Sequence, residues 1–373
     1  MKLTRLLPLL LCISLPTLAA DSLSDQAALG RQLFFDTSLS KNRTQSCASC
    51  HNPAQGFIDT RPGTHTGGSI GDDGHSIGDR NAPTAGYARF SPAFHRRDDG
   101  EWVGGQFWDG RASTLAEQAG GPPLNPVEMG MPDKASVVAR LKENPNYVRQ
   151  FNALFGTGIL EQPAQAYDAM TASLEAFEQS DFFAPFDSKY DRFLRGEAKL
   201  TDQEELGRLL FFSQQFTNCN QCHQLRTHPR ARNEVFSNHE YRNIGTPANV
   251  ALRAVNGADT VDTGLLQNPA VDDPAQAGKF KVPTLRNVAV TGPYMHNGVF
   301  KDLRTVVLFY DKYNNPSRTH NPETGQPWAE PEVEANLALD ELQQGPALED
   351  RRVDAIVAFL KTLTDQRYEH LLE

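Results

Sequence analysis

CASCH at residues 47–51 and CNQCH at residues 219–223 decide the fold of this 373-residue chain. In each pentapeptide the two cysteines and the histidine are spaced i, i+3 and i+4, so one helical turn presents them on a single face. Two thiols at this spacing can form thioethers with the vinyl groups of a haem, while the adjacent imidazole binds the iron. A pair of CxxC redox sites or a four-thiolate zinc site would leave both histidines without a role. The sequence therefore predicts two covalently bound haem c groups, with His51 and His223 as iron ligands.

The cysteines that carry the haems in this interpretation are Cys47, Cys50, Cys219 and Cys222. The fifth, Cys12, lies in the N-terminal stretch MKLTRLLPLLLCISLPTLAA, where basic residues precede an apolar run that ends in small residues. This pattern is typical of a cleaved secretion signal, and the apolar run is shorter than the roughly 20 residues that a membrane span needs. We therefore expect residues 1–20 to be a signal peptide, the mature protein to be periplasmic, and no membrane span.

The formal net charge of the chain is −10, and loss of the signal peptide makes the mature protein more acidic. Nucleic acid is thereby disfavoured as a partner, since its binding depends on basic side chains that neutralise phosphates. An acidic surface is compatible with a small basic redox partner, although it is commonly only a solubility feature. For the assembly we expect a monomer or a homodimer.

A short motif precedes each haem sequence. LGRQLFF at 29–35 and LGRLLFF at 206–212 both have apolar residues at helical spacing, and both lead into CxxCH. Thr201 and Glu204 stand in capping-box register before the second copy. We predict two tandem cytochrome c-like domains, 21–190 for the first haem and 191–373 for the second.

The rest of the chain indicates a mainly α fold with long irregular loops. Helical periodicity marks four further stretches, which are 135–154 with a break near Pro145, 163–179, 303–313 and 352–363. Gly- and Pro-rich loops fill 61–110, 226–296 and 314–347. Loops of this length are unusual unless they are functional or anchored, and packing around haem would anchor them. The C-terminal tail is a candidate to pack on the first domain.

The further iron ligands decide the function, because a haem with two protein ligands mainly carries electrons and one with an open position can bind peroxide. PYMHNG at 293–298 contains the sole methionine of the second half, Met295, next to His296. From the residues alone either side chain is a candidate ligand of the second haem. Tyr294, Met295 and His296 are adjacent in this loop, so their side chains cannot all point at one iron.

Several long motifs carry a resemblance to a known family. Besides the two CxxCH sequences they are RNAPT at 80–84, FWDGRA at 107–112, GPPLNPVEMG at 121–130 and FKVPTLRNVAVTGPYMHNG at 280–298. Together they resemble the bacterial di-haem cytochrome c peroxidases and their MauG-like relatives over nearly the whole mature chain.

The resemblance implies a different ligand for the second haem. In the peroxidases proper a methionine follows the motif histidine by fourteen residues, and in the MauG-like branch a tyrosine stands there; here the position is Tyr310. An anionic phenolate oxygen favours Fe(III), whereas thioether sulfur favours Fe(II). The alternative is that Tyr310 packs in the core of its helix and that Met295 or His296 binds the iron.

At the first haem the resemblance implies a peroxide site. Glu128 matches the family's acid–base position, Gln118 and Pro122 match distal-pocket positions of the MauG-like branch, and Trp108 matches the tryptophan between the two haems. From the residues alone Glu128 could be a loop carboxylate, Pro122 a turn former and Trp108 a core residue.

The resemblance also implies one Ca²⁺ ion, held by the Asn81 side chain and the backbone carbonyls of Thr291 and Pro293, oxygen donors that suit this cation. Asn81 as a simple turn residue is the alternative. Many peroxidases proper carry a histidine that blocks the first haem. His75 is the candidate for that ligand here, but its spacing differs, so we favour an open first haem.

The implied function is reduction of hydrogen peroxide with electrons from a small c-type cytochrome or a cupredoxin. One alternative is peroxide-driven oxidation of residues on a partner protein. The surface tryptophan that serves this purpose in MauG is absent, because Phe216 and Thr217 precede the second haem motif. The other alternative is a non-catalytic di-haem electron-transfer cytochrome.

Overall fold

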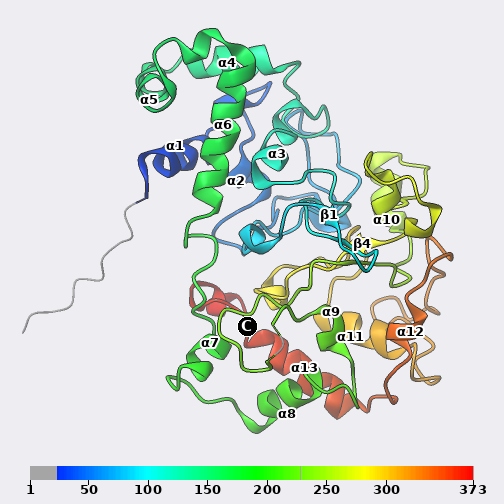
Figure 1. The fold of residues 1–373 in the computed structure, drawn as a ribbon. Coiled ribbons are helices and arrows are strands. Elements are labelled where there is room, and N and C mark those ends of the chain that lie inside the picture. The colour runs from blue at the N-terminus through cyan, green and yellow to red at the C-terminus, as the bar shows by residue number, and fades with distance from the viewer. Residues whose placement is uncertain (1–22, 227, 373) are drawn as a thin grey trace, which may run out of the picture.

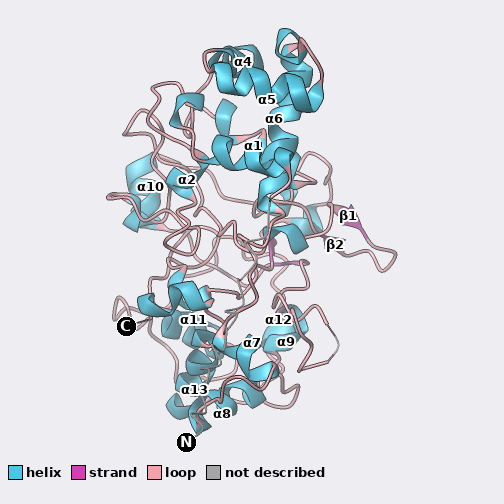
Figure 2. Ribbon diagram, turned by 90° about the vertical axis from the view of Figure 1, so that its left-hand side faces the viewer, coloured by secondary structure: helices cyan, strands magenta, loops and turns pink. Residues whose placement is uncertain are grey.

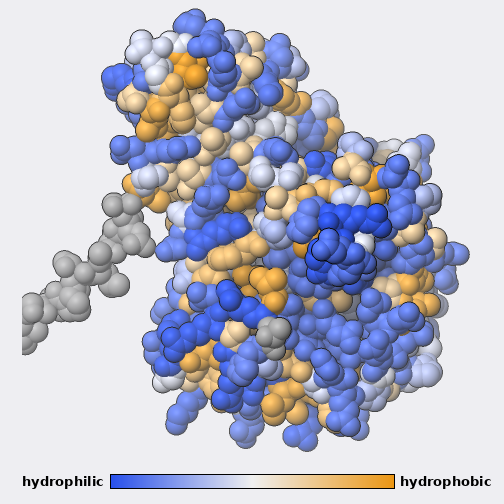
Figure 3. Space-filling model, viewed as in Figure 1, coloured by the Kyte–Doolittle hydropathy of each residue, from blue (hydrophilic) through white to orange (hydrophobic). Residues whose placement is uncertain are grey.

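The computed structural model describes residues 23–372 except Thr227 (Figure 1). Cys12 and the expected signal peptide lie outside this part of the chain. The fold is mainly helical, as predicted, with long loops between the helices (Figure 2). Within the described residues no helix combines the length and apolar character that a membrane crossing requires. The face seen in Figure 3 is largely hydrophilic, with small apolar patches scattered over it.

The helices are α1 (Asp25–Phe34), α2 (Cys47–Cys50), α3 (Leu115–Ala119), α4 (Lys134–Lys142), α5 (Pro145–Phe155), α6 (Pro163–Glu178), α7 (Lys189–Leu194), α8 (Asp202–Phe211), α9 (Cys219–Cys222), α10 (Val250–Asn256), α11 (Leu303–Asp311), α12 (Leu339–Leu342) and α13 (Asp350–Lys361). The strands are short and form two antiparallel pairs, β1 (His95–Arg96) with β2 (Trp102–Val103) and β3 (Tyr241–Arg242) with β4 (Phe280–Lys281).

Most predicted helices are present. The break expected near Pro145 separates α4 from α5, and the other three predicted stretches correspond to α6, α11 and α13. The capping box before α8 is formed as expected, with Thr201 and Glu204 bonding to each other's backbone N–H groups. The loop predicted over 226–296 contains a helix that the sequence did not reveal, α10, and the domain boundary predicted between residues 190 and 191 lies inside α7.

Two separate apolar cores form the upper and lower lobes in Figure 1. The first core includes side chains of α1, α4, α5 and α6, and the second includes side chains of α7, α8, α11 and α13. Each core lies behind one CxxCH helix, since Cys47 packs on the first and Cys219 on the second. The division into domains at residue 190 stays a prediction.

The glycine of the repeated motif explains how each core closes. A Cβ at Gly30 in α1 would lie 1.8 Å from the carbonyl oxygen of Ser173 in α6, and a Cβ at Gly207 in α8 would lie 1.8 Å from that of Ala355 in α13. Only glycine lets backbones approach this closely. The two lobes therefore share one packing device, in which a glycine-bearing helix crosses a longer helix.

Segments of the second half also reach the upper lobe. Asn249, before α10, donates through Nδ2 to the carbonyl oxygen of Thr66 at 2.7 Å. After α13 the chain continues into a 3₁₀ helix, Gln366–Leu371, where the Tyr368 hydroxyl donates to the carbonyl oxygen of Pro53 at 2.7 Å. The loop that follows the first haem motif is thus in contact with the C-terminal end of the chain.

Candidate haem and peroxide site

The first CxxCH motif forms the short helix α2 with His51 as its C-terminal cap. The His51 ring places Nδ1 3.3 Å from the carbonyl oxygen of Phe57, which leaves Nε2 for another partner. Burial lowers the pKa of His51, so the imidazole is neutral at physiological pH. A neutral imidazole whose Nδ1–H is held by a carbonyl is the form that binds a metal through Nε2.

The second motif repeats this arrangement. His223 caps α9, and its Nδ1 lies 3.1 Å from the carbonyl oxygen of Phe236. Burial lowers the pKa of His223 to about 4. Both acceptor carbonyls belong to fully buried phenylalanines with left-handed backbone, at φ 61° for Phe57 and 56° for Phe236. The two histidines are therefore supported in the same way despite different loops.

A cavity of about 430 Å³ adjoins the first motif. It collects Cys47, Cys50 and His51 together with residues from a more distant part of the sequence, namely Trp108, Gln118 of α3, Pro122 and Glu128. The two thiols, a neutral imidazole and an adjoining cavity fit a haem bound to His51. The structure thus brings together the residues that the sequence assigned to the first haem and to its peroxide pocket.

Glu128 is the acid–base candidate in this cavity. Its Oε1 accepts a hydrogen bond from Asn125 Nδ2 at 2.9 Å. Burial raises the pKa of Glu128, and the Arg111 guanidinium and the Asn125 bond partly oppose this rise. A carboxyl group with a raised pKa exchanges protons more readily near neutral pH, as a general acid–base group must.

Trp108 connects the first cavity to a second one of about 140 Å³, because its side chain lines both. The indole is fixed by a hydrogen bond from Nε1 to the carbonyl oxygen of Asn81 at 2.8 Å. The second cavity lies between the lobes, and residues of both halves line it. Trp108 therefore links the cavity beside the first motif to a cavity between the lobes, and its place between two haems stays a prediction.

The three residues assigned to calcium meet at the second cavity. Asn81, Thr291 and Pro293 all line it, and the Asn81 amide nitrogen donates to the carbonyl oxygen of Pro293 at 2.7 Å. With the amide turned over, its oxygen would face the same carbonyl and both could bind a cation. These neutral oxygen donors fit Ca²⁺, with water completing the coordination.

Tyr310 lies near the end of α11, close to the second motif. Burial raises the pKa of its hydroxyl, and negative charge on Cys222 and Cys219 would raise it further, which shows how near the phenol lies to the thiols. A partly buried phenol close to a CxxCH turn fits the role of an iron ligand.

The other candidate ligands lie in different surroundings. Met295 lines the second cavity, whereas His296 is buried and stacks on Phe280 with 3.5 Å between ring centroids. His75 is exposed on a loop where its Nδ1 lies 3.0 Å from the carbonyl oxygen of Asp73, and it is not part of either cavity.

Comparison with known proteins accounts for this arrangement. The family model for the di-haem cytochrome c peroxidases matches residues 24–199. The methylamine utilization protein MauG of Paracoccus denitrificans is 58% identical over 352 residues, which cover 93% of this chain and 90% of that protein. The chain belongs to the di-haem cytochrome c peroxidase family. The cytochrome c peroxidase of Escherichia coli is 30% identical over 91% of this chain and 58% of its own.

Solved structures agree with the family assignment. The diheme peroxidase BthA from Burkholderia thailandensis has a TM-score of 0.80 at 35% identity, over 92% of this chain and 86% of that one. A MauG-like protein associated with microbial copper homeostasis has a TM-score of 0.66 at 30% identity, over 93% of this chain and 91% of that one. As a member of this family, the protein is a di-haem oxidoreductase.

Sequence reasoning missed some residues of the site. Glu178, at the end of α6, lines the first cavity, and burial raises its pKa to about 8. Lys281 lines the second cavity, and burial lowers its pKa to about 8. For Glu178 the available signal was a carboxylate on the apolar face of a stretch with helical periodicity. Nothing in the sequence around Lys281 distinguished it from a surface lysine.

Proposed function

We propose that this protein is a periplasmic peroxidase that reduces H₂O₂ to two molecules of water with two electrons from a redox partner and two protons. The chemistry that haem supplies is binding of peroxide oxygen and transfer of electrons to it. In this proposal Cys47 and Cys50 attach the first haem covalently, and Cys219 and Cys222 attach the second. The expected secretion signal supports the location.

The observation that carries the proposal is the convergence of Glu128, Gln118 and Pro122 on the cavity beside His51. In this pocket the Glu128 carboxylate accepts a proton from one peroxide oxygen and returns it to the oxygen that leaves as water. Asn125 orients the carboxylate through its bond to Oε1. A non-catalytic electron carrier would have no use for a carboxyl group with a raised pKa next to a redox centre.

Electrons reach this pocket from the second haem site in our proposal. His223 and Tyr310 hold the second haem, and Trp108 passes electrons between the two sites. In this proposal calcium bound at Asn81, Thr291 and Pro293 fixes the position of Asn81. The backbone carbonyl of Asn81 accepts the hydrogen bond that orients the Trp108 indole, so the ion also keeps the indole in place. A small c-type cytochrome or a cupredoxin is the donor.

A second candidate is oxidation of residues on a specific partner protein. The chain is 58% identical to one methylamine utilization protein, while two others are 29 and 31% identical and the cytochrome peroxidases are 28 to 32% identical. In this case the electrons for peroxide come from the partner's own side chains. The chain lacks the tryptophan that the MauG-like branch implies before the second haem motif, so another route to the surface would be needed.

The test is a steady-state assay of H₂O₂ consumption by the purified holoprotein, preceded by pyridine haemochrome analysis, for which we expect two haems per chain. H₂O₂ consumption that is coupled to oxidation of a small reduced cytochrome or cupredoxin supports the peroxidase function. Consumption that occurs only with a candidate partner protein, with a mass change on that partner, supports the second candidate. No consumption with any donor, with both haems bound, would refute catalysis of either kind.

A further inference from the structure

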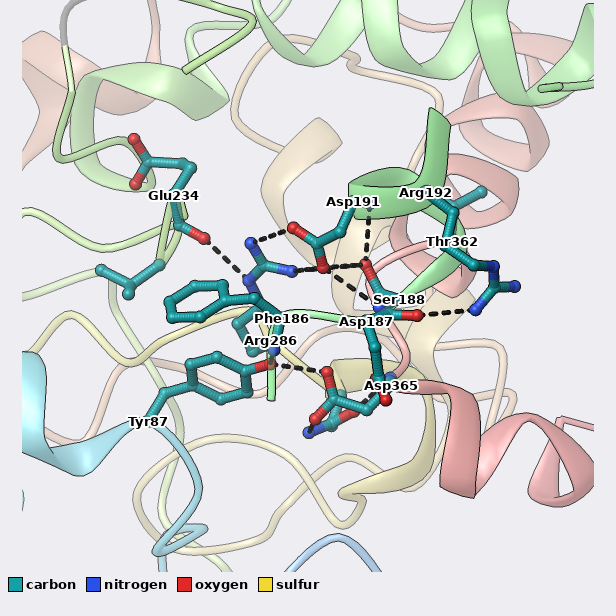
Figure 4. A network of polar contacts seen from close by, with 12 residues as sticks. Tyr87, Phe186, Asp187, Ser188, Asp191, Arg192, Glu234, Arg286, Thr362 and Asp365 are labelled. Atoms are coloured by element: carbon teal, nitrogen blue, oxygen red, sulfur yellow. Dashed lines mark hydrogen bonds and ion pairs between the residues drawn. The ribbon is translucent and has the colours of Figure 1, made fainter. Parts of the chain in front are cut away.

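The C-terminal strap, residues 362–368, runs from the end of α13 to the loop that carries the support of His51. Its first part is bound to the lower lobe, where the Tyr190 N–H donates to the carbonyl oxygen of Thr362 at 2.9 Å. Asn287 and Asp365 then exchange two hydrogen bonds, both of 2.8 Å. The side chain of Asp365 also accepts a bond of 2.5 Å from the Tyr87 hydroxyl, so this carboxylate joins the upper lobe to the strap (Figure 4).

The end of the strap contacts the loop that follows His51. The Arg367 guanidinium lies 5.3 Å from the ring centroid of Phe57, whose carbonyl oxygen faces the His51 ring. The same guanidinium donates to the carbonyl oxygen of Phe182 at 2.7 Å. Tyr368, buried and adjacent, donates to the carbonyl oxygen of Pro53. Two residues of the strap therefore hold both ends of the loop between His51 and Phe57.

The second haem motif has an equivalent support inside its own lobe. Arg286 lies 5.3 Å from the ring centroid of Phe236, whose carbonyl faces His223. This arginine is fixed by two bonds to Asp191, of 2.5 and 3.0 Å, and by a bond of 2.7 Å to the carbonyl oxygen of Glu234 (Figure 4). The loop after His51 is thus supported by Arg367 and Tyr368 of the strap, whereas the loop after His223 is supported by Arg286 of the same lobe.

We propose that Arg367 and Tyr368 are positioning residues for the first haem site, acting through the Phe57 carbonyl on the His51 imidazole. The proposal rests on iron ligation by His51. It assigns to the last residues of the second half a part in tuning the redox site of the first half.

The direction of the effect follows from the hydrogen bond. An Nδ1–H···O=C bond makes the imidazole more electron-donating and stabilises ferric iron. The 3.3 Å separation at His51 is already long, so a small displacement of Phe57 breaks the bond. Loosening the loop should therefore raise the reduction potential of the first haem and leave that of the second unchanged.

The experiment compares Tyr368→Phe, Arg367→Ala and Arg367→Lys with a matched control, Glu369→Gln. Glu369 is in the same 3₁₀ helix, but its carboxylate is paired with Arg192 in α7, at 2.5 Å, and does not touch the loop after His51. Each holoprotein is titrated potentiometrically, the ferric signal of each haem is followed by EPR, and the iron–histidine stretching frequency is measured by resonance Raman spectroscopy. Tyr368→Phe removes one hydroxyl group, so it should fold even if Arg367→Ala does not.

We expect Tyr368→Phe and Arg367→Ala to raise the ferrous-to-ferric ratio of the first haem three- to tenfold at a fixed potential, up to about 59 mV for a one-electron couple, and to lower the iron–histidine frequency. Arg367→Lys, which keeps the positive charge over Phe57, should shift the ratio less. The proposal fails if Tyr368→Phe and Arg367→Ala leave both quantities unchanged, or if Glu369→Gln shifts them equally. Consumption of H₂O₂ by the same holoproteins, with two haems per chain, would show that the proposed function survives that failure.

Discussion

The glycine of the repeated motif provides the sharpest test of the fold. Gly30→Ala and Gly207→Ala each place a Cβ 1.8 Å from a backbone carbonyl oxygen of the crossing helix, whereas real contacts of this kind are essentially never under 3.0 Å. Because backbone cannot rotate away, the helices must separate by more than 1 Å along their contact. Overpacking of this kind costs about 3 kcal/mol, and the better helix propensity of alanine returns about 1 kcal/mol.

We therefore expect each variant to lose about 2 kcal/mol, which corresponds to a Tm lower by roughly 4 to 8 °C for a domain of this size. The matched control is Gly120→Ala at the end of α3, where φ is −81° and a Cβ would meet its nearest atoms at 3.4 to 3.5 Å. Its stability should change by less than about 1 kcal/mol. Differential scanning calorimetry of the holoproteins gives the comparison. A Gly30→Ala protein as stable as the wild type would show that the close crossing of α1 and α6 is not needed for the fold.

Three further predictions concern the site. Glu128→Gln should lower the rate of H₂O₂ consumption by about 10² to 10⁴-fold with both haems retained, because the amide cannot accept the peroxide proton; an unchanged stopped-flow rate would remove Glu128 from the chemistry. The raised pKa of Glu178 means that the unfolded state releases this proton from about pH 4 upward while the folded state keeps it up to about pH 8, so stability falls across that window. Glu178→Gln should abolish this fall in the free energy of unfolding, which amounts to roughly 3 to 5 kcal/mol at pH 8. Urea titrations at several pH values measure it, and identical pH profiles for the variant and the wild type would contradict the burial argument. Chelation of Ca²⁺, or Asn81→Ala, should slow electron exchange between the two haems, and Ca²⁺ but not Mg²⁺ should restore it after chelation; metal analysis that finds no calcium in the native protein would end this proposal.

Local patterns predicted much of the fold. The helices of both cores follow from apolar periodicity, and the start of α8 follows from Thr201 and Glu204, because these signals act within one or two turns. α10 was not predicted, since most of its side chains are exposed and Val250 and Val255 are among them. A short exposed helix has no apolar stripe to reveal it.

The parts of the site that lie in continuous motifs could be predicted from the sequence. The parts formed by contacts between residues far apart in the sequence could not. CxxCH fixes thiols and histidine within one turn, and the family resemblance located Glu128 and Trp108. Arg286 and Asp191 are 95 residues apart, and no spacing rule connects an arginine in a loop to an aspartate in α7. The Phe57 and Phe236 carbonyls could not be predicted either, because they follow their histidines at different distances.

The bond between Tyr368 and Pro53 joins residues separated by 315 positions. Closing so long a loop is entropically costly and comes late in folding. That contact therefore forms only after the two halves of the chain have assembled. The loop that supports His51 reaches its final position late in folding, and a protein whose two halves have not assembled lacks this support.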